Sequence, residues 1–321
     1  HVTDRRQRQM CIRDRVTSGC NQAFCASISS FTSENDEVII PTPWYFNHHM
    51  WLQMAGVKSI PLDTDANMNP IIEKAEALIT DRTRAIVLVS PNNPSGAIYS
   101  NQLLQKFFDL CKSNQIRLII DETYKDFHPN ASQPHTLLEN NNWDQVLTIL
   151  YSFSKTYRMT GHRIGALLTS KENLIEIEKA LDTFTVCPPQ LGQYAANWGL
   201  NNLEAWAAER RTEILQRAKH FSEKFQPLSA AGWSLRGCGA YFAFVEHPFE
   251  DESNILAPLI LRDQGILLMP GTMFYPKHNP LGSRSFRIAF ANIDKNKIST
   301  LLERLKDLSY QRLNSKNNMI S

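Results

Sequence analysis

Short apolar runs recur along the first half of the chain and alternate with longer segments in which apolar residues repeat every three or four positions. The short runs are rich in Val, Ile and Leu and are typical of buried strands, whereas the longer segments are typical of helices that cover a sheet. This alternation predicts an α/β fold with a mostly parallel sheet and helices on both of its faces. The predicted strands are 38–40, 58–62, 85–89, 117–120, 146–150 and 164–168.

A different pattern begins after Pro188 and Pro189, where a long helical region runs to about Phe225. Shorter strands and helices follow, and the last helix has a buried apolar stripe. We therefore predict a large domain at 16–205 and a smaller C-terminal α+β domain, with its connecting helix, at 206–321. The predicted elements of the smaller domain are strands 240–245, 266–269 and 286–290 and helices 254–263 and 298–308.

Residues 1–15 differ from the rest of the chain, because they are rich in arginine, almost lack apolar residues and have neither helical nor strand periodicity. The segment has neither the serine content of a transit peptide nor the apolar core of a signal peptide. Our hypothesis is that it is an artefactual leader in place of a genuine N-terminus. A full-length gene that encodes the same leader would contradict this.

Composition narrows the classes of partner. The chain has 34 Lys and Arg against 32 Asp and Glu, and a net charge of +2 gives no electrostatic footprint for nucleic acid or an anionic membrane. No apolar run approaches the roughly 18 residues of a membrane span. The six cysteines are scattered, without the spacing of a zinc site or a disulfide framework. We therefore expect a soluble, cytoplasmic protein without a metal, nucleic-acid or membrane partner.

The loop after strand 146–150 holds the residues that are best suited to chemistry. Lys155 lies there at the rim of a predicted core, where partial desolvation lowers the pKa of an amine and suits it to form an imine with a carbonyl compound. Ser152, Ser154 and Arg163 can offer hydroxyl groups and a forked cation to one anionic group, such as a phosphate. An isolated Ser-x-x-Lys is more often a solvated loop, so the interpretation depends on the other strand ends.

Several other polar or aromatic residues follow a predicted strand or begin a helix. Gly19 lies in a turn before a helix, and the free N–H groups of a helix start can bind an anion. In parallel sheets, ligands bind beyond the carboxyl ends of the strands, so these residues can converge on one site. Each feature alone is also found in ordinary protein cores, and His48, His49 and His162 are interpreted as structural. The residues expected at the site are Cys20, Tyr45, Asn93, Asp121 and Lys155.

Four motifs in one order resemble a known family. They are Asn93-Pro94-Ser95-Gly96, Asp121-Glu122-Thr123-Tyr124, Ser152-Phe153-Ser154-Lys155 with Gly161-x-Arg163 after it, and Phe286-Arg287-Ile288-Ala289-Phe290. Together they resemble the class I/II aminotransferases, which are pyridoxal-phosphate (PLP) enzymes of fold type I in the aspartate aminotransferase superfamily. The resemblance covers residues 16 to about 309, and it implies that the predicted sheet is of the seven-stranded type.

The resemblance implies a role for each residue at the centre of the site. Lys155 would hold PLP as an internal aldimine, yield it to the substrate amine and move a proton between the substrate Cα and the cofactor. Asp121 would pair with the pyridine nitrogen and keep the ring an electron sink. Asn93 and Tyr124 would hydrogen-bond the ring's O3′.

The resemblance also implies the groups around the ring, the phosphate and the substrate. Tyr45 would stack on the ring, with Trp44 as a rival. The phosphate would lie on the turn Gly19, Cys20 and Asn21, with Ser152 and Arg163 completing the cradle. The family's turn is usually richer in glycine than this one. Arg287 would bind the α-carboxylate of the substrate, and Asn93 would also contact the substrate.

One departure concerns the N-terminal part that family members usually carry before the phosphate turn, which includes an arm onto the partner subunit. It is not recognisable before Val16, so we expect an N-terminally truncated member whose intact parent is a homodimer. The expected activity is a ping-pong transamination between an α-amino acid and a 2-oxo acid in amino-acid metabolism. Two alternatives stay open: a PLP-dependent lyase on the same fold, and a non-catalytic PLP-binding remnant or regulatory module.

Overall fold

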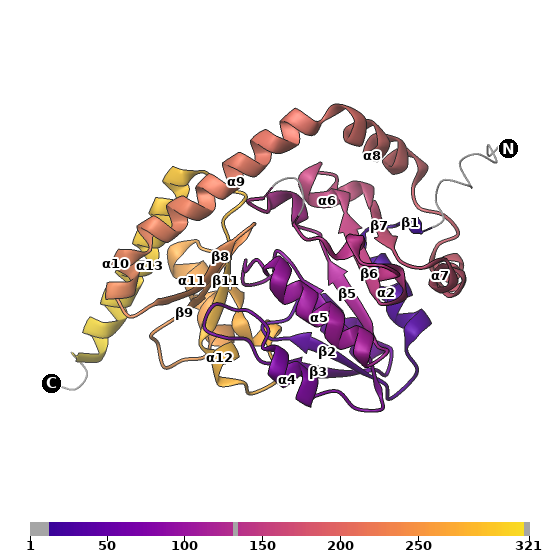
Figure 1. Ribbon diagram of the computed structural model, residues 1–321. Helices are drawn as coiled ribbons and strands as arrows, with labels where there is room; N and C mark the ends of the chain where they lie inside the picture. The colour runs from indigo at the N-terminus through magenta and orange to yellow at the C-terminus, as the bar shows by residue number, and fades with distance from the viewer. Residues whose placement is uncertain (1–12, 131–133, 318–321) are drawn as a thin grey trace.

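The computed structural model describes residues 13–130 and 134–317, so residues 1–12 of the predicted leader lie outside the described part. A seven-stranded sheet in the order β1-β7-β6-β5-β4-β2-β3 forms the centre of the larger part (Figure 1). Strands β2 to β6 run parallel, whereas β7 is antiparallel to both β6 and β1. This confirms the predicted fold class. The strands are β1 (Asp14–Thr17), β2 (Glu37–Pro41), β3 (Lys58–Leu62), β4 (Thr83–Val89), β5 (Arg117–Asp121), β6 (Leu147–Ser152) and β7 (Gly165–Leu168).

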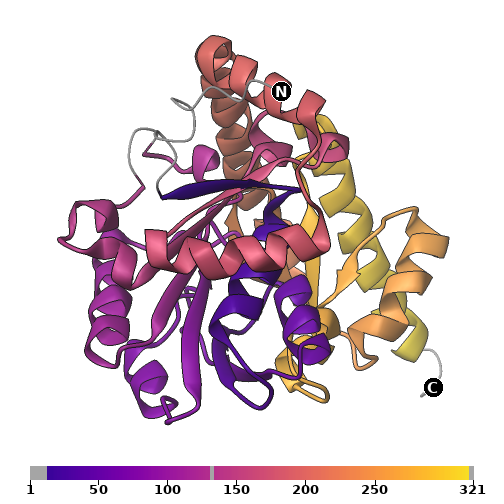
Figure 2. The ribbon, with the colours of Figure 1, turned by 90° about the vertical axis from the view of Figure 1, so that its right-hand side faces the viewer.

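Helices cover both faces of this sheet because successive strand residues point to opposite sides. Val38 and Ile40 pack with α2 (Cys20–Phe31), α3 (Phe46–Met54) and α7 (Lys171–Phe184) on one face, which Figure 2 shows with α7 in front. Ile39 points to the other face, where α4 (Ile72–Ala77) and α5 (Asn101–Ser113) lie. Our sequence analysis did not predict α7, although its buried residues Leu174, Ile177 and Leu181 have a helical period.

Strand β1 is a second difference, because it begins at Asp14, inside the segment that we interpreted as a leader. It pairs with β7 along its whole length, and its Arg15 forms a 2.6 Å ion pair with Glu178. Charged side chains at the solvated edge of the sheet hide the strand from a search for apolar runs.

The smaller part is an antiparallel sheet in the order β10-β11-β9-β8 with helices packed on it. The long helix α9 arches from α8 to this part (Figure 1). The core of this smaller part includes the large buried side chains of Phe221, Trp233 and Phe286. The predicted strand 266–269 is largely wrong, because residues 266–268 are not in a strand and β10 shares only Met269 with the prediction. The elements are α8 (Gln190–Asn202), α9 (Glu204–Lys224), α10 (Gln226–Ala230), β8 (Ser234–Gly239), β9 (Phe242–Glu246), α11 (Ser253–Gln264), β10 (Met269–Pro270), α12 (Pro280–Ser283), β11 (Ser285–Ala289) and α13 (Lys295–Asn317).

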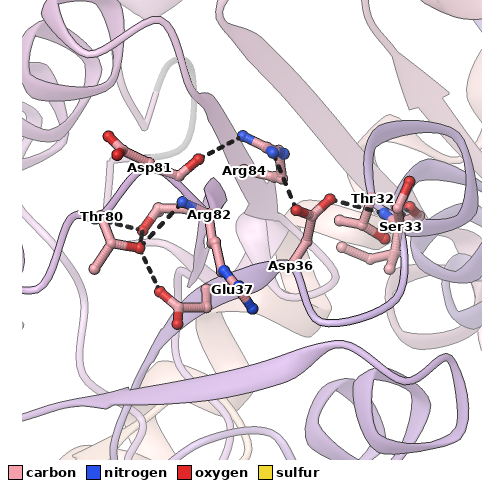
Figure 3. Close-up of polar contacts among 10 residues, drawn as sticks. Thr32, Ser33, Asp36, Glu37, Thr80, Asp81, Arg82 and Arg84 are labelled. Carbon is pink, nitrogen blue, oxygen red and sulfur yellow. Dashed lines mark hydrogen bonds and ion pairs between the residues drawn. The ribbon is translucent and has the colours of Figure 1, made fainter.

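The amino ends of β2 and β4 are tied together by polar contacts at the edge of the sheet away from the candidate site (Figure 3). Asp36 accepts a 2.8 Å hydrogen bond from the Ser33 N–H and pairs with Arg84 at 3.1 Å. Thr80 donates a 2.6 Å hydrogen bond to Glu37. These contacts stabilise the amino ends of β2 and β4, whereas the candidate site lies at the carboxyl ends of the strands.

The two sheets meet at the turn that contains Asn93 and Gly96. Gly96 has a φ of 73°, and a Cβ at this position would lie 2.3 Å from the backbone nitrogen of Gly239 in β8. Only glycine permits both this conformation and this approach. The motif glycine therefore fixes the smaller sheet beside the carboxyl end of β4. Within the described residues, no helix is both long and apolar enough to cross a membrane.

Candidate active site

A cavity of about 500 Å³ opens at the carboxyl ends of β4, β5 and β6 and is closed on its other side by residues of β9 and β11. Every site residue predicted from the sequence lines this cavity except Gly19, which directly precedes the lining residue Cys20. The structure therefore brings the predicted residues together, including Lys155, Asp121 and Arg287.

Lys155 lies on α6 (Phe153–Thr156), a short helix that starts where β6 ends. Ser152 caps this helix, because its Oγ accepts a 3.2 Å hydrogen bond from the Ser154 N–H. The Lys155 Nζ lies 5.8 Å from the centroid of the Tyr124 ring. Burial, followed by the positive charges of Arg287 and Arg163, lowers the pKa of Lys155. The site thus favours a neutral amine, which is the form that can act as a nucleophile or base.

Asp126 connects the segments that carry Lys155 and Tyr124. Its Oδ2 accepts two hydrogen bonds of 2.6 Å, one from the Tyr151 hydroxyl on β6 and one from the Thr156 hydroxyl on α6. Asp126 itself lies two residues after Tyr124 in a short 3₁₀ turn. One carboxylate oxygen therefore joins the tyrosine loop to the lysine helix.

Asp121 ends β5 and is buried at the floor of the cavity. Its Oδ2 lies 3.3 Å from Nε2 of His48, and its Oδ1 accepts a 2.9 Å hydrogen bond from the Thr123 N–H. Burial alone would raise the pKa of Asp121, but the contacts with His48 and Thr123 outweigh burial and hold this pKa below its ordinary value. His48 stacks on Phe24 with ring centroids 3.9 Å apart. The carboxylate is thus held ionised in a fixed orientation.

The start of α2 faces Arg163. Gly19 has a φ of 88°, and a Cβ there would lie 2.1 Å from Nη2 of Arg163, so only glycine lets the guanidinium approach the helix start. Nη1 of Arg163 donates to the Thr160 carbonyl at 2.9 Å and contacts the Ser154 hydroxyl at 3.5 Å. Burial raises the pKa of Cys20, the first residue of α2, so its thiol stays neutral. Helix N–H groups, hydroxyls and a guanidinium form a cradle for an anion.

Tyr45 and Trp44 have separate environments, although either could be the stacking residue by sequence. Tyr45 lines the cavity, and its hydroxyl accepts a 2.8 Å hydrogen bond from the Asn47 side chain. Trp44 stacks on His49 with centroids 4.1 Å apart and donates to the Met273 carbonyl at 3.2 Å. Of these two residues, Tyr45 is therefore the one whose ring can face a ligand.

Arg287 reaches the cavity from β11. Its Nη1 donates a 2.9 Å hydrogen bond to Oδ1 of Asn93, and its Nη2 contacts the sulfur of Met269. Its Cζ lies 4.6 Å from the ring centroid of Phe242 and 5.3 Å from that of Phe274. Its buried Nε has no hydrogen-bond partner among the described residues. Burial lowers the pKa of Arg287. A guanidinium held among aromatic rings can still receive a carboxylate.

Other lining residues were not singled out from the sequence. Thr123 lies next to predicted residues and Thr160 near Arg163, whereas Tyr241 lies in the turn between β8 and β9 and Phe242 begins β9. The Tyr241 hydroxyl donates a 3.3 Å hydrogen bond to the carbonyl of Lys155. Aromatic residues in an apolar strand are indistinguishable from core residues in the sequence alone. Residues 13–130 and 134–317 contain no group of three or more His, Cys, Asp or Glu that could hold a metal ion.

Known proteins resemble this chain in both sequence and structure. The family model for aminotransferase class I and II matches residues 13–305. Aromatic-amino-acid aminotransferase 2 of Thermococcus litoralis is 25% identical and covers 86% of this chain and 71% of its own length. Aspartate aminotransferase of Thermotoga maritima is 26% identical and covers 92% and 75%. The crystal structure of an aromatic aminotransferase from Pyrococcus horikoshii is 25% identical, has a TM-score of 0.84 and covers 94% of this chain and 80% of its own. The two curated names state different substrates.

Proposed function

The chain belongs to the aminotransferase class I and II family and is a transaminase, and from this premise we propose that it uses PLP in the cavity around Lys155. The amino group moves from an α-amino acid to a 2-oxo acid in two half-reactions of a ping-pong cycle. The observation that carries this proposal is that Lys155, Asp121 and Arg287 line one cavity. These residues come from α6, β5 and β11, which are far apart in the sequence.

The cavity fits PLP in its donor groups. The cradle of α2, Arg163, Ser152 and Ser154 suits a phosphate, and Gly19 leaves the space that the guanidinium needs. Tyr45 offers a face for the pyridine ring, and the ionised Asp121 suits a protonated pyridine nitrogen.

The chain's own residues supply binding, orientation and proton transfer. When bound, PLP supplies an electron-poor ring that accepts the electron pair left at the substrate Cα. Lys155 would hold the cofactor through Nζ and, as a free amine, would take the Cα proton on the same nitrogen, because its lowered pKa favours the neutral form. Asn93 and Tyr124 would donate hydrogen bonds to the ring oxygen, and Asp121 would favour the protonated form of the ring nitrogen.

Arg287 orients the substrate. Two guanidinium nitrogens can bind the α-carboxylate as a pair, and the Asn93 contact fixes the plane of the guanidinium. By holding the carboxylate, Arg287 turns the Cα–H toward Lys155. The rate then gains from the proximity of the two groups and not from a more reactive amine.

Steady-state kinetics with PLP-loaded protein tests the proposal. We expect parallel double-reciprocal lines for amino acid and 2-oxo acid, and a new 2-oxo acid formed in equal amount to the amino acid consumed. Reduction with borohydride and peptide mass spectrometry should find the cofactor on Lys155. Attachment at another lysine, or release of ammonia instead of amino-group exchange, would contradict the proposal.

We further propose that the protein acts as a homodimer in the cytoplasm. The apolar side chains of Leu191, Tyr194 and Trp198 on α8 are 81%, 66% and 59% exposed, and a surface of this kind is typical of a protein interface. The cysteines of the described residues are unpaired, which is typical of a reducing compartment. Sedimentation velocity tests the dimer, with Trp198→Glu expected to weaken it.

A further inference from the structure

The helix that carries Lys155 is too short to hold the lysine in place by itself. It contains four residues, and the carbonyl groups of a last helical turn have no partner within the helix. The Lys155 carbonyl accepts a hydrogen bond from the Arg158 N–H, but at 3.5 Å this bond is long. Arg158 has a φ of 54°, so the backbone leaves the helical path within three residues of the lysine. The orientation of Lys155 therefore depends on contacts from outside α6.

Tyr241 provides a contact of this kind. Its hydroxyl donates a 3.3 Å hydrogen bond to the Lys155 carbonyl. Its ring packs against those of Tyr124 and Phe127, with centroids 5.3 and 4.8 Å away. Burial raises the pKa of Tyr241 to about 12, so the hydroxyl stays protonated and can donate. One side chain thus contacts both the main chain of Lys155 and the ring of Tyr124.

The backbone of Tyr241 is fixed by the smaller sheet. Gly239 pairs with Phe242 at the end of the β8–β9 hairpin, so Ala240 and Tyr241 form its two-residue turn. The Tyr241 carbonyl accepts a 3.1 Å hydrogen bond from the Phe290 N–H, which directly follows β11. The turn is therefore joined to β9 by the chain and to the end of β11 by a hydrogen bond.

Arg287 belongs to the same hydrogen-bonded frame. Strand β11 pairs with β9, and in this register Arg287 lies opposite Phe244 and Ala289 opposite Phe242. The ladder fixes the distance between the main chains of Arg287 and Tyr241. The Tyr241 hydroxyl extends this frame to the main chain of Lys155. All of these contacts join groups of one chain, so they do not depend on a partner subunit.

We propose that Tyr241 is a positioning residue for amino transfer, which holds the Lys155 amine at a fixed place relative to the carboxylate site at Arg287. This inference rests on the proposed function, in which Nζ of Lys155 must reach the Cα–H of a substrate whose carboxylate is bound by Arg287. Displacement of the amine lowers the rate of proton transfer without removing a group that binds the substrate.

Tyr241→Phe tests the proposal, because it removes the hydroxyl and keeps the ring. Single turnovers of the PLP-loaded full chain with L-alanine, L-aspartate and L-phenylalanine are followed by the loss of visible absorbance. For each amino acid that reacts, we expect the limiting rate constant to fall about 5-fold, as for the loss of one neutral hydrogen bond. The half-saturating concentration should stay the same, because Arg287 keeps its place. An unchanged limiting rate constant overturns the proposal.

A pH titration of the visible absorbance gives a readout that a purely structural role would not change. Burial and the positive charges of Arg287 and Arg163 lower the pKa of Lys155. These influences act fully only while the nitrogen is held beside them. In Tyr241→Phe we therefore expect the titration to move to higher pH. A variant that folds normally and titrates like the wild type contradicts the proposal.

Hydrogen exchange of the cofactor-free chain tests the contact without turnover. The Arg158 N–H donates to the same carbonyl as Tyr241, so peptides that contain residues 155–158 should exchange faster in Tyr241→Phe. Tyr275→Phe is the matched control, because it removes a hydroxyl from the smaller part at a residue outside the lining of the described cavity. The control should leave exchange, titration and rate as they are. Exchange in Tyr241→Phe equal to that of the wild type excludes the hydroxyl as a support of Lys155.

Tyr241→Leu separates the role of the ring from that of the hydroxyl. It removes both, so we expect a larger loss of rate than in Tyr241→Phe. If only Tyr241→Leu slows the reaction, the packing on Tyr124 is what matters and the assignment to the hydroxyl is wrong.

The outcomes separate this proposal from the proposed function. If the wild type exchanges amino groups and Tyr241→Phe equals it, the role of Tyr241 is wrong while the proposed function stands. If the PLP-loaded wild type exchanges no amino group, the proposed function is wrong, and hydrogen exchange of the cofactor-free chain still decides whether Tyr241 holds Lys155.

Discussion

The contacts of Asp126 lead to a prediction about how the segments of the site are held together, because one of its oxygens joins the Lys155 helix to the Tyr124 loop. The perturbation is Asp126→Asn, which keeps the shape of the side chain and removes its charge. The bonds at stake are those from Tyr151 and Thr156, both of 2.6 Å. We expect the Lys155 helix and the Tyr124 loop to lose their fixed separation while the fold persists.

The magnitude follows from the type of bond. A hydrogen bond to a carboxylate contributes about 1.5–3 kcal/mol and a neutral one about 0.5–1.5 kcal/mol. Two bonds weakened in this way lower the free energy of unfolding by about 2 kcal/mol, which is about 4 °C in Tm for a chain of this size. A small displacement of Lys155 has a larger effect on rate, and we expect kcat to fall by about 10-fold or more with little change in KM.

The assays are thermal unfolding, steady-state kinetics and a pH titration of the visible absorbance of the PLP-loaded protein. Displacement of Tyr124 should move the absorbance titration to higher pH, because the ring oxygen loses a hydrogen bond. Asp182→Asn removes a charge from the exposed face of α7 and is the matched control. Asp126→Glu should recover part of kcat. If Asp126→Asn keeps kcat within twofold and the titration does not move, the reasoning is refuted.

Three further predictions concern the groups around the cofactor. Lys155→Ala should abolish the visible absorbance of PLP-loaded protein, and an unchanged spectrum would exclude Lys155 as the attachment point. Arg287→Leu should raise the KM for the amino acid by about 100-fold, whereas the exposed neighbour in Arg284→Leu should leave it unchanged; equal effects would remove the carboxylate assignment. The lowered pKa of Asp121 means that its carboxylate stabilises the fold above its ordinary pKa of about 4 and that this stabilisation is lost as the pH falls. The difference in Tm between wild type and Asp121→Asn should therefore shrink from roughly pH 5 to pH 3, and a constant difference would contradict the role of the His48 contact.

Much of this site could be predicted from the sequence because the sheet is mostly parallel. In such a sheet the carboxyl ends of the strands share one edge, so residues that follow successive apolar runs must lie near one another. Asn93, Asp121 and Ser152 could therefore be placed without coordinates. Arg287 could not be placed in this way and was identified only through the family resemblance.

The contacts that orient these residues are less visible in the sequence. His48 is three positions after Tyr45, so a helix places both on one face, and their ring centroids are 5.0 Å apart. That spacing is a signal that our interpretation of His48 as structural did not use. Asp126 offers no such signal, because its partners Tyr151 and Thr156 lie in another segment and the pairing depends on how the loop folds back.

The two halves of the cavity come from different sheets. The groups suited to the cofactor come from the seven-stranded sheet and its loops, whereas Arg287, Tyr241 and Phe242 come from the second sheet or its edge. The close backbone contact at Gly96 and the hydrogen bond from Arg287 to Asn93 fix the two halves against each other. Phe242 takes part in this seam, because its backbone oxygen also lies against Gly96 and its ring packs on Arg287, with the Cζ atom 4.6 Å from the ring centroid. A change of backbone position at Phe242 should therefore disturb the Arg287 guanidinium as well as the cavity wall.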